Sequence, residues 1–286
     1  MMEHIEIIEN RSNGGEQVTL IRPRQGWRLL DIKELWAYRE LLWVLMMRDL
    51  KVRYKQTVMG VAWAVIQPVM TMLVFTIFFG HLAKIPSDGY PYPVFLYAAL
   101  LPWNYFANTV TNCSNSLVGS ANLVNKIYFP RLLIPLTSVG AGLVDFAISG
   151  AILLILMLIY GLEWNSKLLL SPLLVLAVTF IALGVGTLLS ALTVAYRDFR
   201  YVITFLIQLW MFVTPVVYPT SMIPERWQWV FYLNPMAGLI DGFRSAFLGR
   251  TYDVWGLSIS FAMGIFVFFA GIVYFEKVER RFADII

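Results

Sequence analysis

Charge and cysteine are scarce in this sequence, and each scarcity excludes a class of protein. Only 14% of the 286 residues are charged, whereas soluble domains have about 25%, and 59% are hydrophobic. A polytopic membrane protein is therefore expected. Cys113 is the single cysteine, which excludes an internal disulfide framework and a cysteine-based metal cluster.

The sequence also lacks the motifs of nucleotide-dependent and hydrolytic enzymes. No stretch matches GxxxxGK[ST] or HExxH, and the two histidines, His4 and His81, lie far apart. We therefore predict no catalytic residue, no metal site and no cofactor on this chain. Transport against a gradient would need energy from another subunit or from an ion gradient. The first 26 residues are polar and have no apolar region of the kind found in cleavable signal peptides.

Six segments are apolar over about the 20 residues that a membrane-spanning helix needs. They cover residues 58–80, 94–118, 134–160, 168–194, 201–218 and 254–275. The predicted fold class is an all-α integral membrane protein with six transmembrane helices, forming a transmembrane domain at residues 58–276. A polar tail (1–26) and an interface helix (27–57) precede this domain, and a short tail (277–286) follows it.

Lysine and arginine gather on one predicted side of the membrane. Of the 22 basic residues, 17 lie on the side that holds both termini and 5 on the other. The positive-inside rule therefore predicts cytoplasmic termini in a multi-pass membrane protein. The basic residues Arg48, Lys51, Arg53 and Lys55 end where the first span begins, at the face where anionic headgroups attract them. The net charge of +4 thus indicates topology, and no nucleic-acid partner is expected.

The interface helix is predicted from apolar residues at helical spacing between charged ones, with Trp27, Trp36 and Trp43 as anchors. Such a helix is expected to lie in the cytoplasmic headgroup layer. The alternative is a cytosolic helix packed on a partner.

Four amides share one face of the second span. Asn104, Asn108, Asn112 and Asn115 are spaced by four, four and three residues. Because amides are costly against lipid, this face must look toward protein or water. Hydrogen bonds between helices and the lining of a hydrated conduit are both consistent with the pattern.

Asp145 lies near the middle of the third span, and an intramembrane carboxylate is a functional candidate. No basic residue lies within another predicted span to pair with it. A hydrogen-bonded helix contact and a transport role both stay open.

Aromatic side chains on the first and fifth spans could stack on sugar rings, although packing and interface belts use the same residues. They are Trp63, Phe75, Phe78, Phe79, Phe205, Trp210, Phe212 and Tyr218.

A proline-rich stretch, residues 219–250, predicts a helical hairpin before the last span. Pro224 is a suitable helix start, Asn234 and Pro235 interrupt the helix, and a second short helix carries Asp241 and Arg244 on one face. Neither helix can span, so the hairpin is expected to dip into the outer surface or rest on it.

Four stretches in order resemble the membrane subunit of type 2 ABC exporters: "RDLKVRYKQTVMGVAWAVIQPV", "NLVNKIYFPRLLIP", "AYRDFRYV" and "TPVVYPTSMIP…LNPMAGLIDGFR". The chain is most similar to permeases for O-antigen and other lipid-linked polysaccharides, and to teichoic acid exporters, from about residue 27 onward. The family usually has Leu-Gly where this chain has Met59 and Gly60.

The resemblance implies export of lipid-linked polysaccharide by a homodimer. Two copies of a separate ATP-binding subunit would accompany it and would hold the ATP and Mg. The loop at residues 119–133 would be the coupling segment, and the hairpin would be the outer gate. The residues implied for the coupling contact are Asn125, Lys126, Ile127, Tyr128, Phe129, Pro130, Arg131, Arg197 and Asp198. Those implied for the lipid entrance are Arg48, Lys51, Arg53, Lys55, Met59 and Gly60.

By the same resemblance the aromatic residues named above, with Asn104, Asn108 and Asn112, would line the substrate channel. The outer gate would comprise Pro224, Trp227, Trp229, Asn234, Pro235, Asp241 and Arg244. The alternatives are an exporter of teichoic acid or of a small hydrophobic compound. A membrane glycosyl enzyme would need paired acidic residues, and an ion-coupled carrier would need a repeat and a paired charge; the sequence shows neither.

Overall fold

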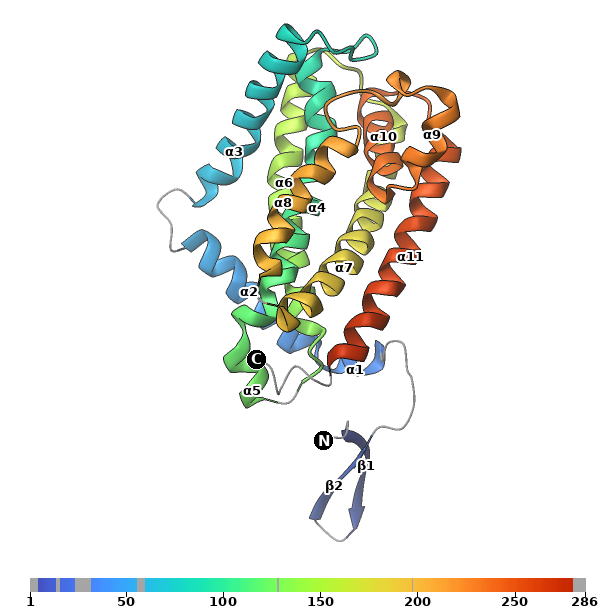
Figure 1. Ribbon diagram of the computed structural model, residues 1–286. Coiled ribbons are helices and arrows are strands. Elements are labelled where there is room, and N and C mark those ends of the chain that lie inside the picture. Colours follow the sequence, from blue (N-terminus) through green and yellow to red (C-terminus); the bar gives the residue numbers. More distant parts are fainter. Residues whose placement is uncertain are drawn as a thin grey trace.

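A computed structural model describes residues 5–13, 16–23, 32–55, 60–127, 129–196 and 198–279. Most described residues form helices that run along one long axis (Figure 1). The elements are β1 (Ile5–Asn13), β2 (Glu16–Pro23), α1 (Ile32–Ala37), α2 (Arg39–Lys55), α3 (Gly60–Phe75), η1 (Thr76–Leu82), α4 (Tyr92–Gly119), α5 (Ala121–Lys126), α6 (Leu133–Ile159), η2 (Ser166–Leu170), α7 (Ser171–Ala195), α8 (Phe199–Val213), η3 (Thr220–Met222), α9 (Glu225–Tyr232), α10 (Pro235–Leu248) and α11 (Val254–Glu279).

The helical membrane fold is confirmed. Among the described residues, the stretches long and apolar enough to cross a membrane are Ala62–Leu82, Leu133–Ile159, Ser166–Ala195 and Val254–Glu279. Helix α4 has the length but a more polar composition, and α8 is shorter. The count of six spans therefore stays a prediction for these two helices.

Helix α8 ends five residues before the predicted boundary of the fifth span. Thr214 has φ −91° and ψ 139°, an extended conformation. Proline disfavours helical geometry in the residue before it, and Pro215 follows Thr214. Tyr218 therefore lies beyond the helix, in a segment of turns and bends, and the prediction that it decorates the fifth span is wrong.

The segment before the first span differs from the single interface helix predicted at residues 27–57. A turn at Tyr38 separates α1 from α2. Helix α2 packs along α6, where a Cβ on Gly140 would lie 2.0 Å from the Met46 side chain. Its other face exposes apolar side chains, among them Trp43 and Val52. One face of α2 thus packs against α6, and the other face exposes apolar side chains.

Antiparallel strands β1 and β2 form a two-stranded sheet within the predicted polar tail. This hairpin is an exception to the all-α prediction, which holds for the membrane unit. At the other end of the chain, α11 continues to Glu279, so helix extends three residues into the predicted tail at 277–286.

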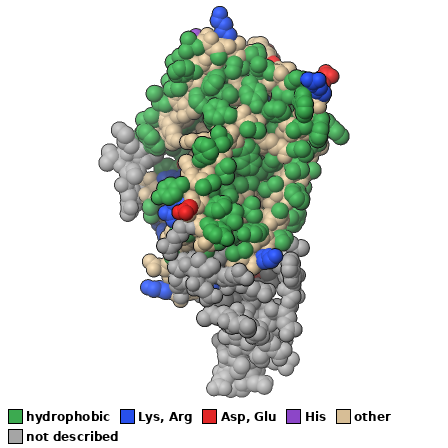
Figure 2. Space-filling model, viewed as in Figure 1, with side chains coloured by type: hydrophobic (Ala, Val, Ile, Leu, Met, Phe, Trp, Pro, Cys, Tyr) green, Lys and Arg blue, Asp and Glu red, His purple; other side chains and the backbone are tan. Residues whose placement is uncertain are grey.

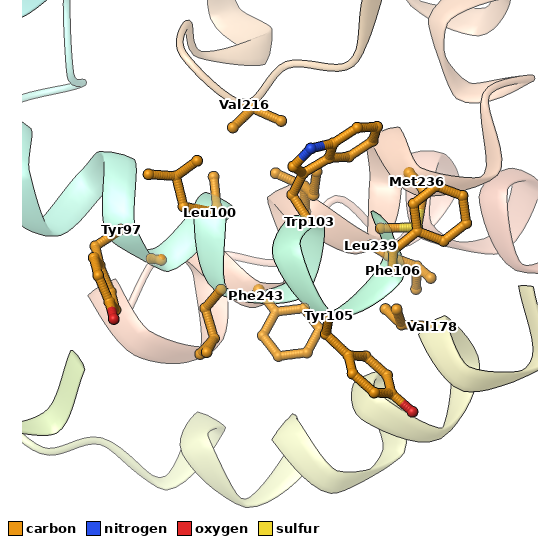
Figure 3. Packing of buried hydrophobic residues seen from close by; sticks show 14 of the residues in the cluster. Tyr97, Leu100, Trp103, Tyr105, Phe106, Val178, Val216, Met236, Leu239 and Phe243 are labelled. Atoms are coloured by element: carbon orange, nitrogen blue, oxygen red, sulfur yellow. The ribbon is translucent and has the colours of Figure 1, made fainter. Parts of the chain in front are cut away.

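Helix α4 forms the centre of the bundle. Its side chains pack with those of α7 and α10 in the main hydrophobic core (Figure 3). Core residues from three helices meet there: Tyr97, Leu100, Trp103, Tyr105, Phe106, Val178, Leu239 and Phe243. Outside this core, hydrophobic side chains dominate the face drawn in Figure 2, as expected for a surface in contact with lipid or another apolar partner.

The two ends of the bundle differ. Helices α1, α5 and the end of α11 lie at one end, and α9 and α10 lie at the other (Figure 1). All residues of α10 are buried, and α10 packs against α4, α7 and α11. Helix α10 is therefore enclosed by the bundle, while Trp227 and Trp229 of α9 are exposed. The placement of the hairpin relative to the outer membrane surface stays a prediction.

Candidate functional site

An open polar face on α4 is the first feature that fits a substrate path. Asn108 is exposed, and Asn104 and Asn112 are half-buried, although most of α4 is buried. Among the described residues these three amides make no hydrogen bond to another helix. The Nδ2 of Asn115 donates to the Thr111 carbonyl at 2.9 Å, and its buried Oδ1 has no partner there. The structure therefore does not supply the interhelical bonds that one interpretation required.

The same face of α4 closes toward the end that carries α9 and α10. Leu101 and Tyr97 continue the asparagine line over two further turns, and both are buried. There η1 and α4 pack together, and a Cβ on Gly80 would lie 2.8 Å from Tyr92. Toward the α5 end, α3 stands away from the bundle (Figure 1). The amide face is thus open at one end and covered at the other.

Aromatic side chains are carried by α3 with η1 and by α8, and these helices also contact α4. Four are exposed: Trp63, Phe78, Phe205 and Phe212. The others are half-buried, and Phe75 meets Phe79 edge to face with ring centroids 5.4 Å apart. Trp210 packs on Phe106 of α4 at 5.1 Å, so it belongs to the helix packing.

Asp145 has a partner that the sequence analysis missed. Arg53 forms an ion pair with one carboxylate oxygen, and the Tyr54 hydroxyl donates to the other. Burial, followed by the hydrogen bond to Asp145, raises the pKa of Tyr54 to about 12, which keeps this donor protonated. A basic partner was expected only within another span. Arg53 instead lies on α2, before the first span, and α2 packs along α6.

Breaking this pair is expected to destabilise the packing of α2 on α6. Arg53→Met or Asp145→Leu alone leaves the other polar group without its main partner, and the double variant removes both. The side chains are 35% and 21% exposed, so we expect a moderate coupling of about 1–2 kcal/mol. Thermal unfolding of the purified protein in detergent measures it, with Arg48→Met in the exposed Arg48–Asp49 pair as the control. Additive single effects would contradict the coupling.

The residues predicted for the lipid entrance are only partly described. Arg48 and Lys51 are exposed on α2, and Arg53 is half-buried. Lys55 ends α2 and Gly60 begins α3, but the side chain of Lys55 lies outside the described part, as does Met59 altogether. The described cationic side chains therefore stand beside the end of α3 that lies away from the bundle.

The predicted coupling loop contains the short helix α5. Lys126 and Ile127 are exposed, while Phe129 is buried in a second apolar cluster with Leu117 and Leu133. The backbone N–H of Arg131 donates to Glu279 Oε1 at 3.3 Å, which ties the loop to the end of α11. The loop is thus anchored on one side and free to contact a partner on the other.

Other residues predicted for the coupling contact have mixed placements. Pro130 and Arg131 are half-buried, and Asp198 is exposed at the start of α8. Tyr128 and Arg197 lie outside the described residues, and so does the side chain of Asn125.

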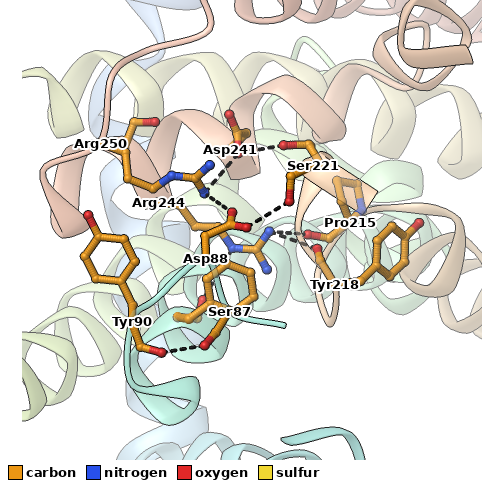
Figure 4. Close-up of polar contacts among 12 residues, drawn as sticks. Ser87, Asp88, Tyr90, Pro215, Tyr218, Ser221, Asp241, Arg244 and Arg250 are labelled. Atoms are coloured by element: carbon orange, nitrogen blue, oxygen red, sulfur yellow. Dashed lines mark hydrogen bonds and ion pairs between the residues drawn. The ribbon is translucent and has the colours of Figure 1, made fainter. Parts of the chain in front are cut away.

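Arg244 holds the opposite end together. Its side chain is fully buried, and its Nη1 and Nη2 donate to the carbonyls of Pro215 at 2.8 Å and Val216 at 2.6 Å (Figure 4). The guanidinium also lies 3.8 Å from the ring centroid of Phe95. A residue of α10 therefore fixes both the segment after α8 and the first turns of α4.

Asp241 and Arg244 share a face of α10 but have different partners. Asp241 accepts a hydrogen bond from Thr220 at 3.2 Å and lies 3.9 Å from Arg250. Arg250 also pairs with Asp88 at 2.9 Å (Figure 4). The network therefore joins α10 to the loop between η1 and α4.

Asn234 links α8 to α10. Its Oδ1 accepts from Trp210 Nε1 at 3.0 Å and from the first turn of α10, and its Nδ2 donates to Thr214 at 2.8 Å. Of the other predicted gate residues, Pro235 is buried and Pro224 is exposed. Asn234 therefore connects the end of α8 to the start of α10 by side-chain hydrogen bonds.

Asp88 and Arg250 were missed because each lies in a loop with no periodic pattern around it. The turn motif "SDGY" marked a loop but gave no indication of a partner 162 residues away along the chain. Nothing local distinguishes such a pair from solvated charges.

Comparison with known proteins agrees with this architecture. The model of the ABC-2 type transporter family matches residues 40–248. An O-antigen export system permease protein RfbA of Klebsiella pneumoniae is 31% identical over 251 residues, which cover 86% of this chain and 95% of that protein. A protein of the same name from Myxococcus xanthus is 31% identical over 257 residues, covering 88% and 98%. The polysialic acid transport protein KpsM of Escherichia coli is 23% identical over 224 residues, covering 76% and 84%.

The family match covers well over half of the chain, and the 31% identical relatives are covered almost from end to end. The chain is thus a transport component with several apolar membrane helices, and it belongs to the ABC-2 type transporter family of membrane permeases.

Proposed function

We propose that this chain is the membrane-spanning subunit of an ABC transporter that exports lipid-linked, O-antigen-like polysaccharide across the bacterial inner membrane. The observation that carries the proposal is the near end-to-end similarity to permeases named for O-antigen export. The open amide face of α4 and the exposed aromatic side chains of α3, η1 and α8 support it, because amides bond sugar hydroxyls and aromatic rings stack on sugar rings.

In this proposal ATP hydrolysis takes place in a separate subunit, two copies of which bind ATP and Mg. The ATP-binding subunit contacts the α5 end, where Lys126 and Ile127 are exposed next to the anchored Phe129. A push on this loop reaches α11 through Arg131 and reaches α6 directly, since α6 starts two residues after Arg131.

A second copy of the chain would complete the path. Apolar side chains of α3 and α8 are exposed, and the amide face of α4 is uncovered. A homodimer would enclose both surfaces. Both termini and the α5 end would then be cytoplasmic, in agreement with the distribution of basic residues. The α9–α10 hairpin would be the outer gate.

The cationic residues of α2 would attract the phosphate groups of the lipid carrier. Arg48 and Lys51 are exposed for such a contact. Neutralising both, with insertion in the membrane unchanged, should lower export; unchanged export would leave membrane anchoring as their role.

Depletion of this protein should block export while synthesis continues. We expect lipid-linked polysaccharide to disappear from the surface of intact cells and to accumulate inside, as measured with a glycan-specific probe on intact and lysed cells. Re-expression of the chain should restore the surface signal. An unchanged surface without internal accumulation would reject polysaccharide export and favour a small hydrophobic compound as the substrate.

A further inference from the structure

Apart from Arg200 at the start of α8, α4 and the helices α3 and α8 that contact it carry no charged residue. The sequence has no Asp, Glu, Lys or Arg at residues 60–82, 92–119 or 201–213, which cover α3 with η1, α4, and α8 from its third residue onward. Apart from Arg200 and from His81 at the end of η1, the polar side chains that these helices expose are neutral amides and hydroxyls, namely Gln67, Asn108, Tyr201, Thr204 and Gln208. Beyond Arg200, a path bounded by these helices therefore offers hydrogen bonds without fixed charge.

The one carboxylate within the predicted spans does not alter this balance. Asp145 is paired with Arg53 and bonded to Tyr54, so the group contributes a dipole and no net charge. The exposed cations Arg48 and Lys51 lie on α2, before the first span. Positive charge is thus available where a substrate would arrive and absent along the way.

This distribution has opposite consequences for two kinds of glycan. A charged group that leaves water for a low-dielectric passage pays a large desolvation cost unless a countercharge meets it, and pores for anions carry rings of Lys or Arg. A sugar hydroxyl needs only a donor or an acceptor. An amide supplies both, as a hydroxyl itself does.

We propose that the translocation path selects an uncharged, polyhydroxylated glycan chain and rejects one with a carboxylate in each repeat. Asn104, Asn108 and Asn112 exchange hydrogen bonds with successive hydroxyls, since their spacing places them about 6 Å apart along the helix axis, close to the length of one sugar unit. The phosphate charge of the carrier stays at the membrane surface beside α2. This inference rests on the proposed export function.

The test uses proteoliposomes that hold the full chain with its ATP-binding subunit. Two lipid-linked glycans of equal length are supplied, one neutral and one in which the hydroxymethyl group of each repeat is replaced by a carboxylate. We expect ATP-dependent transport of the neutral glycan to be at least 10-fold faster. Equal rates would overturn the charge selection and leave the export function standing. Transport of neither glycan, with the ATPase active, would reject the export function itself and this inference with it.

Variants at Asn108 separate hydrogen bonding from charge. Asn108→Leu should slow transport of the neutral glycan about 5- to 10-fold, Asn108→Gln should retain most of it, and Asn108→Lys should raise the rate for the acidic glycan. The control is Ser258→Leu, at an exposed position on α11. Wild-type transport of the neutral glycan by Asn108→Leu, at equal protein per vesicle, would show that the amide does not bind the substrate.

Discussion

Gly271→Leu is expected to remove most of the correctly assembled protein from the membrane. Helices α7 and α11 cross in backbone contact, and a Cβ on Gly271 would lie 2.0 Å from the carbonyl oxygen of Gly184. That oxygen belongs to the backbone and cannot rotate away, so the helices must separate. Small residues at helix crossings in membranes permit this close approach. The measurement is the amount of monodisperse protein recovered in detergent and its Tm.

Gly150→Leu is the matched control for this crossing. Gly150 lies on α6, and a Cβ there would meet nothing within 4 Å. Normal yield is expected, because the added side chain has space. If both variants gave the same yield, the helix contact between α7 and α11 would not limit assembly.

Arg244→Met should have the second large effect. Methionine keeps much of the volume but donates no hydrogen bond, so the carbonyls of Pro215, Val216 and Tyr218 lose their donor. Each buried acceptor left unsatisfied costs about 1–3 kcal/mol. The loss should be several kcal/mol in the folded protein, with release of the segment that follows α8. A drop in Tm together with faster proteolysis near residues 214–219 would report it.

Arg226→Met serves as the control, because Arg226 is exposed on α9 near the same end of the bundle. Its substitution should leave Tm within about 1 °C, as exposed charges contribute little. Arg244→Lys should be intermediate, since an ammonium has donors but lacks the planar fork that reaches several carbonyls at once. An Arg244→Met protein as stable as the parent would refute this role.

Periodicity predicted the helices closely and their ends less well. Spans predicted from apolar length agree with α3, α4, α6, α7 and α11 within a few residues. The error at α8 arose because apolar composition continues beyond Val213, whereas the helix ends before Thr214, where the following Pro215 disfavours helical geometry. Apolar composition indicates which residues are buried, whereas a proline restricts the backbone dihedral angles of the residue before it.

The candidate site was predictable where neighbours in sequence are neighbours in space. The asparagine face of α4 followed from spacing alone, because residues three and four apart share a side of a helix. Asp145 could be identified as unusual in the same way, but its partner could not, because Arg53 lies 92 residues away. Arg244 was expected on a face of a short helix, with no indication that it would bind carbonyls.

The sequence by itself determined the class of protein, the helical segments, the uneven distribution of basic residues and the polar face of α4. Each of these depends on composition or on spacing along one helix. Only the tertiary structure decided that α10 is buried, that Arg53 meets Asp145, and that one end of the amide face is covered. These features depend on how the helices cross, and crossings are set by contacts such as that of Gly184 with Gly271. Glycines have no side chain, so such a contact produces no periodic pattern in the sequence.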